Sequence, residues 1–224
     1  MEYEKIKKII LKELRENLPE HLSYHSVMHV KDVIDAVEKI AIAEKVNDED
    51  IMTNEPYDSP QKPFGGDEDY IFSPDGKKVV YVSKKKAGTA YATSTNTDLY
   101  EYDIESKTTK NLTEKNLGYD VAPQFSPNGD LSWLQMKQDG YEADKNDIIV
   151  RHKGLDINLT SNWDGTVDSF TWSKDGSKVY FIAAIDGTKQ LFEVNFPGLT
   201  KIMVRVNQIT KGDWLVTDIL GFNE

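Results

Sequence analysis

The histidines His25 and His29 form the first pair of residues whose type and spacing could do chemistry. They stand four residues apart within a helical pattern, which places both imidazoles on one face where they could meet a metal ion or a substrate. A metal site needs three or four ligands, and no further ligand stands nearby in the sequence. The pair is therefore interpreted as an incomplete, non-catalytic metal site, with a structural or surface role as the simpler alternative.

Nucleophilic catalysis has little basis in the chain. No G-x-S-x-G nucleophile elbow occurs, and the serine of Thr93-Ser94-Thr95 lies in an expected loop without a neighbouring base. Cysteine is absent, which excludes thiol chemistry and disulfides. We therefore predict that the chain by itself is not an enzyme and needs no cofactor.

A repeated turn indicates the elements that would position any functional residue. Segments 72–76, 125–129 and 172–176 read Phe-Ser-Pro-Asp-Gly, Phe-Ser-Pro-Asn-Gly and Trp-Ser-Lys-Asp-Gly. Proline presets φ and the Asp-Gly or Asn-Gly pair supplies positive φ, so each segment predicts a hairpin between two strands. The turn serine recurs after 53 residues (73 to 126) and again after 47 (126 to 173).

Each period carries four short β-rich runs, and the last run of each ends in Asn-Leu-Thr, Asn-Leu-Thr or Gln-Ile-Thr. Four strands in a period of roughly 40 to 50 residues are typical of β-propeller blades. Strands are expected near residues 69–73, 78–84, 97–103, 107–112, 120–126, 130–137, 146–152, 156–160, 166–173, 178–185, 189–195 and 201–209, with one extra strand at about 214–219.

The predicted fold is mainly β with an N-terminal α segment. Residues 1–52 have the apolar periodicity of two amphipathic helices, residues 53–68 are rich in turn formers and predict a linker, and residues 69–224 predict three blades and the first strand of a fourth. Closed propellers have four or more blades. Open blade faces would expose apolar surface and strand edges, so we expect self-association through them, or a cap by the helices.

The composition excludes several classes of partner. A net charge of −11 argues against a nucleic-acid surface. The chain has no run of 18 consecutive apolar residues, so no membrane-spanning helix is predicted. The charged N-terminus does not have the pattern of a secretory signal. We therefore expect no nucleic-acid or membrane partner, and a cytoplasmic location for the chain as it stands.

Other residues have simple structural explanations. Trp133 and Trp172 fall in strands and are expected between sheets, whereas Trp163 and Trp214 fall in loops or at strand starts. The basic run 84–86 is expected at a solvated hairpin tip. Asn111 and Asn158 match the glycosylation triplet, but their recurrence at the end of a blade explains them without sugar.

Residues 18–33, which include Tyr24-His25 and His29, resemble the opening helices of HD-domain metal-dependent phosphohydrolases. That resemblance implies a metal-ligand or proton-donor histidine, but the His-Asp dipeptide that completes the metal centre in this family is missing. Beside the blades, the segment makes the chain look like a chimera of two incomplete domains, either engineered or joined from two reading frames.

Residues 63–76, together with 97–103 and 111–113, resemble the propeller of prolyl-oligopeptidase-type serine peptidases, in the branch of dipeptidyl and acylaminoacyl peptidases. The resemblance covers nearly all of residues 53–224 and implies a propeller that filters access to a hydrolase domain; propellers of this family are often exported. Some members hold a substrate's amino terminus with propeller carboxylates, which makes Asp67, Glu68 and Asp69 candidate ligand-binding residues. Solvated rim charges are the simpler explanation of this run.

The sequence thus predicts a non-catalytic propeller fragment that binds a peptide or self-associates. Three alternatives stay open: part of a serine peptidase whose hydrolase domain is absent from this chain, part of an HD-type phosphohydrolase, or an engineered chimera without biological function.

Overall fold

The structure is a computed structural model that describes residues 57, 59, 65–200 and 204–221. The chain divides into two compact units, Met1–Glu55 and Pro56–Glu224. The two predicted helices, with His25 and His29, lie outside the described residues, so the incomplete metal site and the HD resemblance stay predictions.

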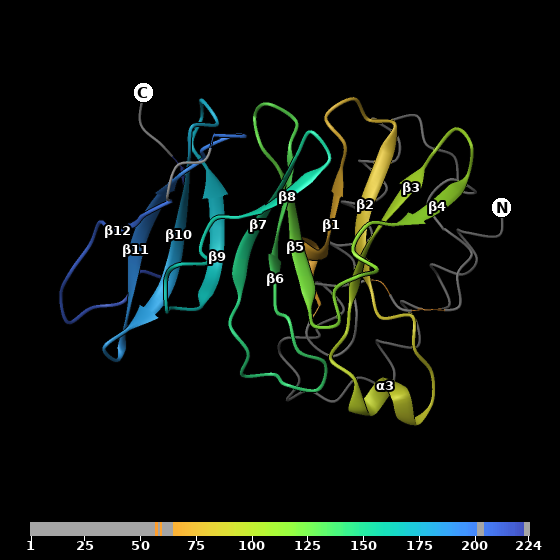
Figure 1. The fold of residues 1–224 in the computed structure, drawn as a ribbon, viewed down its shortest axis with the longest axis horizontal. Helices are drawn as coiled ribbons and strands as arrows, with labels where there is room; N and C mark the ends of the chain where they lie inside the picture. Colours follow the sequence, from red (N-terminus) through yellow and green to blue (C-terminus); the bar gives the residue numbers. More distant parts are fainter. Residues whose placement is uncertain (1–56, 58, 60–64, 201–203, 222–224) are drawn as a thin grey trace, which may run out of the picture. The chain divides into compact units, whose positions relative to one another are not determined.

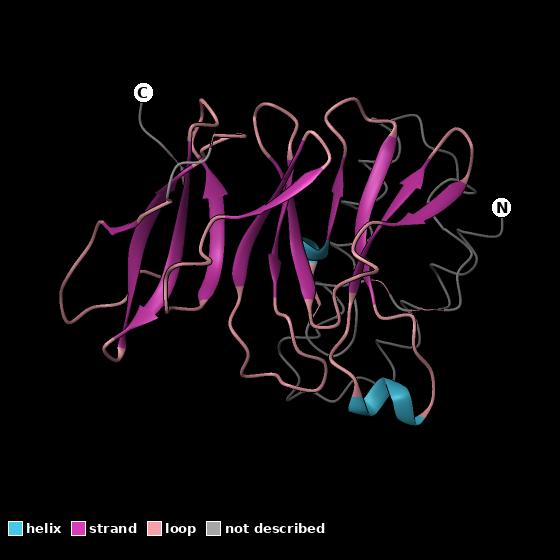
Figure 2. Ribbon diagram, viewed as in Figure 1, coloured by secondary structure: helices cyan, strands magenta, loops and turns pink. Residues whose placement is uncertain are grey.

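Three four-stranded antiparallel sheets make up the described part of the second unit (Figures 1 and 2). Each sheet takes four consecutive strands in the order in which the chain supplies them. This meander, repeated three times, confirms the predicted partial propeller. We call the sheets blades 1, 2 and 3. Blade 1 contains β1 (Tyr70–Phe72), β2 (Lys78–Ser83), β3 (Asp98–Asp103) and β4 (Thr108–Asn111), and blade 2 contains β5 (Asp120–Phe125), β6 (Leu131–Gln135), β7 (Asp147–His152) and β8 (Leu155–Asn158). Blade 3 contains β9 (Val167–Trp172), β10 (Lys178–Ile185), β11 (Thr188–Asn195) and β12 (Val206–Gln208).

The repeated turn has the predicted hairpin form in all three blades. In blade 1, Ser73 Oγ accepts the Lys78 N–H at 3.0 Å and donates to Asp75 Oδ1 at 2.6 Å. Gly76, the turn glycine, has a φ of 68°, a conformation that favours glycine. The glycines of the other two turns have φ values of 85° and 69°, so the same local chemistry begins the second strand of every blade.

Alternating side chains of the strands form the core between neighbouring blades. In the first interface, Val80, Val82 and Leu99 of blade 1 pack against Leu131, Trp133 and Ile149 of blade 2. The second interface joins blade 2 to aromatic side chains of blade 3, including the stacked rings of Phe181 and Phe192. Because the side-chain period of a strand is two, one blade presents opposite sets of residues to its two sides.

Two details of the predicted architecture are wrong. The extra strand expected at about 214–219 is not formed, since residues 215–220 have no strand structure and only the Val216 N–H pairs with a strand, donating to the Lys189 carbonyl at 2.8 Å. The connection between β2 and β3 contains a short helix that the sequence did not suggest, α3 (Thr89–Thr93). Among the described residues, no helix has the length and apolar character needed to cross a membrane.

Candidate functional site

The two ends of the blades differ in how their strands are connected. The repeated turns join the first and second strands at one end, which we call the turn end. At the opposite, loop end, the second and third strands of blades 1 and 2 are joined by residues 84–97 and 136–146. Long loops on a rigid scaffold are the usual place for binding residues, so the loop end is the candidate site.

Asp139 fastens the two long loops together. Its Oδ1 atom accepts hydrogen bonds from Ser94 Oγ at 2.6 Å, the Thr95 N–H at 2.8 Å and the Asn96 N–H at 3.3 Å. The Ser94 bond and the two backbone N–H groups hold the pKa of the Asp139 carboxyl below its usual value. Gly140 N–H adds a bond to Thr95 Oγ1 at 2.9 Å, so the loops of blades 1 and 2 form one surface.

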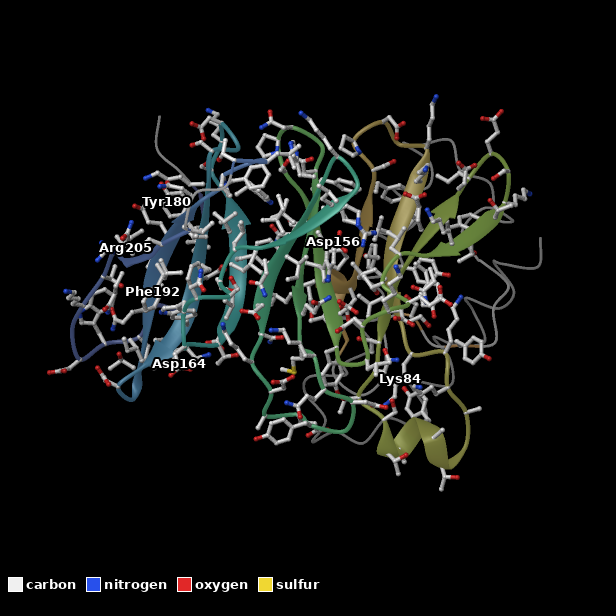
Figure 3. All side chains as sticks on the ribbon, viewed as in Figure 1. Lys84, Asp156, Asp164, Tyr180, Phe192 and Arg205 are labelled. Atoms are coloured by element: carbon white, nitrogen blue, oxygen red, sulfur yellow. The ribbon has the colours of Figure 1, made fainter. Side chains whose placement is uncertain are left out.

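Lys84 begins the first of these loops and is only 8% exposed. Figure 3 labels Lys84 near α3. The Nζ atom of Lys84 lies 4.5 Å from the centre of the ring of Tyr91, a residue of α3. Burial lowers the pKa of its amine, and the charges of Asp139 and Glu142 only partly oppose that effect. The prediction of a solvated hairpin tip is therefore wrong for Lys84, because its side chain is buried and contacts the ring of Tyr91.

Tyr119 and Glu142 complete the candidate site, which we call the loop-end site and define as Lys84, Tyr91, Tyr119, Asp139 and Glu142. The pKa of the Tyr119 hydroxyl is raised by burial first, and then by the charges of Glu142 and Tyr91. Glu142 is exposed. The same two neighbours, Tyr91 and Glu142, thus influence both Tyr119 and Lys84, which places the four side chains in one region.

The predicted acidic run falls at the beginning of blade 1 and is split by the structure. Asp67 and Glu68 are exposed in a short 3₁₀ turn, as expected of rim charges, whereas Asp69 is buried. Asp69 Oδ1 accepts the backbone N–H of Ala122 in blade 2 at 3.4 Å, and burial raises its pKa to about 6. The explanation as solvated charges is therefore wrong for Asp69, while ligand binding by Asp67 and Glu68 stays a prediction.

Ala122, whose backbone N–H bonds to Asp69, lies in an irregular part of β5. The ladder between β5 and β6 shifts register between Val121 and Gln124, and Ala122 has a φ of 52°, which is uncommon outside glycine. Such a bulge re-aims the backbone of a strand. Here it accompanies the hydrogen bond that joins the 3₁₀ turn before blade 1 to the first strand of blade 2.

Asp120 is a fully buried carboxylate that the sequence did not single out. One of its oxygens accepts hydrogen bonds from Trp133 Nε1 at 2.7 Å and Gln135 Nε2 at 2.8 Å, and the other accepts one from Asn116 Nδ2 at 2.9 Å. Burial raises its pKa to about 6 in spite of these donors. The carboxylate therefore ties a loop and two strands of blade 2 together.

Asp147 is the second buried carboxylate of blade 2, and it has a cation. Lys145 Nζ lies 2.7 Å from Oδ1, and Thr160 Oγ1 and Asn158 Nδ2 donate at 2.7 and 2.9 Å. Burial alone would raise the pKa of this carboxyl, but Lys145 and the two hydrogen-bond donors outweigh burial and lower it. Lys137 Nζ stands farther away, at 3.6 Å.

The threonine that ends each period closes its blade in the same way. The hydroxyls of Thr113, Thr160 and Thr210 accept the backbone N–H of Leu99, Ile148 and Leu191 at 3.0, 3.1 and 2.8 Å. The amides of Asn111 and Asn158 donate to Asp98 and Asp147 at 3.0 and 2.9 Å. The side chains of the glycosylation-like triplets therefore form hydrogen bonds that close the blades, in agreement with the predicted place of these triplets at blade ends.

The tryptophans are arranged largely as predicted. Trp133 is buried in the interface of blades 1 and 2, and Trp172 donates from Nε1 to Ser132 Oγ across the next interface at 2.9 Å. Trp163 packs against Phe181 with ring centroids 5.2 Å apart, whereas Trp214 is half exposed. Within the described ranges, no group of three or more acidic or histidine side chains could hold a metal ion.

No family model matches the chain. The chain is 39% identical to dipeptidyl-peptidase 5 of Porphyromonas gingivalis over 166 residues, and this alignment covers 73% of the chain and 24% of that protein. Dipeptidyl-peptidase 5 of Porphyromonas endodontalis is 38% identical over 177 residues, or 78% of this chain and 24% of that protein. Among solved structures, TolB from Acinetobacter baumannii matches with a TM-score of 0.43 and 19% identity over 64% of this chain and 33% of that one.

The chain thus spans about a quarter of the length of the curated relatives it matches. Together with the three blades, the similarity over about three quarters of the chain supports a propeller of the peptidase type.

Proposed function

We propose that these blades form a non-catalytic binding module of a dipeptidyl-peptidase-like protein, with peptides as the ligand. The observation that carries the proposal is the 39% identity over 166 residues to a protein named dipeptidyl-peptidase 5. The relatives' name suggests the peptide class, and the surface formed by the two long loops is where a ligand would meet the blades.

The buried carboxylates support binding over catalysis. Asp69 and Asp120 carry raised pKa values of about 6, which is the property expected of a general acid or base. Both carboxylates, however, already accept hydrogen bonds within the architecture, Asp69 from the first strand of blade 2 and Asp120 from the second, and both side chains are buried. A proton-transfer group must reach its substrate, so these two carboxyls serve the architecture.

A second candidate is a contribution to a serine peptidase whose hydrolase part is supplied outside the residues of this chain. The length of the relatives favours it, because the alignment covers only 24% of dipeptidyl-peptidase 5. In that case the same blades would restrict access to a catalytic centre on another part of the protein.

Self-association is a further form of binding that exposed apolar side chains favour. Ile209, Trp214 and Leu215 follow one another within a few residues at the end of blade 3, and each is about half exposed. Clustered apolar side chains on a surface commonly mark contact with another protein. Light scattering on a size-exclusion column tests this form, and a strictly monomeric chain would contradict it.

Hydrolysis of a dipeptidyl p-nitroanilide by the purified chain tests the proposed function. We expect no turnover above buffer, with unchanged tryptophan fluorescence showing that the blades are folded during the assay. Turnover that co-purifies with the chain and is blocked by a serine-directed inhibitor would show a catalytic protein and overturn the proposal. Release of product only after a hydrolase partner is added would favour the second candidate.

A further inference from the structure

Lys84 is a buried lysine that has no anionic partner among the described residues. Its side chain is 8% exposed, and within the part of the chain that the structure describes it makes no hydrogen bond or ion pair, only the contact with the Tyr91 ring at 4.5 Å. Lysines are almost never buried unless they are paired. The structure therefore leaves a positive charge at the loop end that nothing in these blades neutralises directly.

The aromatic contact does not replace a counter-ion. A cation over a tyrosine ring is attracted by the ring quadrupole, but this attraction is weaker than the cost of removing an ammonium group from water. Burial is accordingly the largest influence on the Lys84 amine, and it lowers the pKa. A ligand that brings an anionic oxygen would complete the site.

The neighbouring carboxylates are not placed to do so. Asp139 already accepts three hydrogen bonds from residues 94–96 through a single oxygen, which keeps that oxygen directed at the loop. Glu142 is exposed, and no ion pair joins it to Lys84 among the described residues. Tyr119 contributes a half-buried hydroxyl that makes no hydrogen bond to any described residue, so a second donor stands in the same region.

We infer that the loop-end site binds a carboxylate group of a peptide, with Lys84 as the cationic donor, Tyr91 as its aromatic support and Tyr119 as a second donor. The chemistry of the two groups fits, because an ammonium group and a hydroxyl both donate to carboxylate oxygens. Tyr141, which is half exposed on the same loop as Asp139, offers an aromatic face to the adjoining residue of the peptide. The inference deepens the proposed binding function, since it names the chemical group that is recognised.

Calorimetric titration of the full chain with N-acetyl-Ala-Ala-Ala, as free acid and as C-terminal amide, tests this site. Acetylation removes the peptide's positive charge, so the two probes differ only at the carboxylate. We expect the acid to bind at least about tenfold more tightly than the amide, and added salt to weaken only the acid. Equal binding of acid and amide, or no binding of either at millimolar concentration, would overturn the inference.

Matched variants locate the recognition. Lys84→Met should lose the preference for the acid, whereas Lys115→Met, which removes an exposed lysine from a neighbouring loop, should keep it. Glu142→Gln should strengthen acid binding severalfold, because it removes a competing negative charge. Retention of the acid preference in Lys84→Met would contradict the inference.

Two further arms keep the result interpretable. If Lys84→Met has altered tryptophan fluorescence, Tyr91→Leu replaces it, and the same loss is expected because the aromatic support is gone. N-acetyl-aspartate diamide, which carries its carboxylate on a side chain, distinguishes recognition of a peptide terminus from recognition of any carboxylate. Hydrolysis is assayed in the same samples, so cleavage of a dipeptidyl substrate would overturn the non-catalytic function while leaving carboxylate recognition to be judged by its own titration.

Discussion

Asp120 and Asp147 are two buried carboxylates of the same blade, and their pKa values move in opposite directions. Asp120, at the start of β5, is fully buried among neutral donors, and burial raises its pKa to about 6. Asp147, at the start of β7, is 1% exposed, yet its pKa is lowered. The difference is Lys145, whose Nζ atom lies 2.7 Å from Asp147, while no lysine or arginine pairs with Asp120 among the described residues.

The comparison shows that burial alone does not decide the state of an acid in these blades. Hydrogen bonds from neutral donors offset part of the rise in pKa that burial causes at Asp120. At Asp147 a close cation is needed to turn that rise into a fall. Lys84 shows the converse case, because it is a buried cation with no carboxylate of the described residues within ion-pair distance. In blade 2 the charge of Asp147 is therefore neutralised by Lys145, whereas no described carboxylate pairs with the charge of Lys84 in the loop-end site.

Removal of the cation should make Asp147 behave as Asp120 does. Lys145→Met leaves the carboxylate buried with only the more distant Lys137, and we expect a loss of about 3 kcal/mol in the free energy of unfolding, at the low end for breaking a buried pair. Urea unfolding followed by tryptophan fluorescence measures the change, since Trp133 and Trp172 are buried in strands of blades 2 and 3.

The pH dependence of that variant separates charge from packing. Without Lys145 the pKa of Asp147 rises, so protonation should restore part of the lost stability when the pH is lowered to about 5. A deficit of the same size at neutral and acidic pH would show that the lysine acts through its aliphatic chain instead.

Acid should stabilise the parent chain through Asp120 and Asp69. The folded-state pKa of each is about 6, above the ordinary value of 3.8, so the folded chain holds these protons more tightly than the unfolded chain. The free energy of unfolding therefore rises as the pH falls through 6, and this contribution is lost as the pH rises again. From about pH 7.5 to about pH 5 we expect a gain of about 1 kcal/mol for each group, or about 2 in total.

Asp120→Asn tests the assignment, because the amide does not titrate and about half of the gain should disappear. The exposed residue Asp164 supplies the control, since Asp164→Asn should leave the gain intact. Carboxyls with lowered pKa values, such as Asp147 and Asp175, lose their contributions only at lower pH. Stability that falls steadily between about pH 7.5 and about pH 5 would contradict the prediction.

The blade-closing threonines sharpen the comparison between charged and neutral networks. Thr160 is fully buried and bonds both Ile148 N–H and Asp147, whereas Thr210 is less buried and bonds Leu191 N–H and the neutral Gln190. Thr160→Val should cost about 2 kcal/mol and Thr210→Val about 1 kcal/mol, because bonds to charged groups and fully buried partners are costlier to break. Equal losses in urea unfolding would show that the backbone bond, common to both, carries the effect.

The strand order could be predicted because its signals are local. Each turn combines a serine with Asp-Gly or Asn-Gly within five residues, and the strands beside it are apolar or aromatic over the lengths that the structure shows. The closing threonine repeats at nearly constant spacing, which predicts the Asn111 and Asn158 triplets at blade ends, where the structure has them.

The site could be predicted only in part, because its contacts join distant residues. Asp69 meets Ala122 across 53 positions, and Asp139 meets Ser94 across 45, so neither pairing leaves a trace in a local pattern. The surface preference of lysine predicts Lys84 in solvent, whereas its side chain is buried beside Tyr91. The three periods carry one more signal, since Asp98, Asp147 and Gln190 occupy the same place before apolar residues of the third strand.

The smallest expected change in stability belongs to a solvent-exposed ion pair in blade 3. Lys189 Nζ lies 2.9 Å from Asp168, nearly the distance of the Lys145 pair, but the two side chains are 49% and 32% exposed. Water and salt screen such a pair, so Lys189→Met should change the free energy of unfolding by less than about 0.5 kcal/mol. The Lys189 carbonyl that accepts the Val216 N–H is unaffected by the substitution. A loss comparable to that of Lys145→Met would mean that ion-pair distance, and not burial of the acid, governs the stability of these blades.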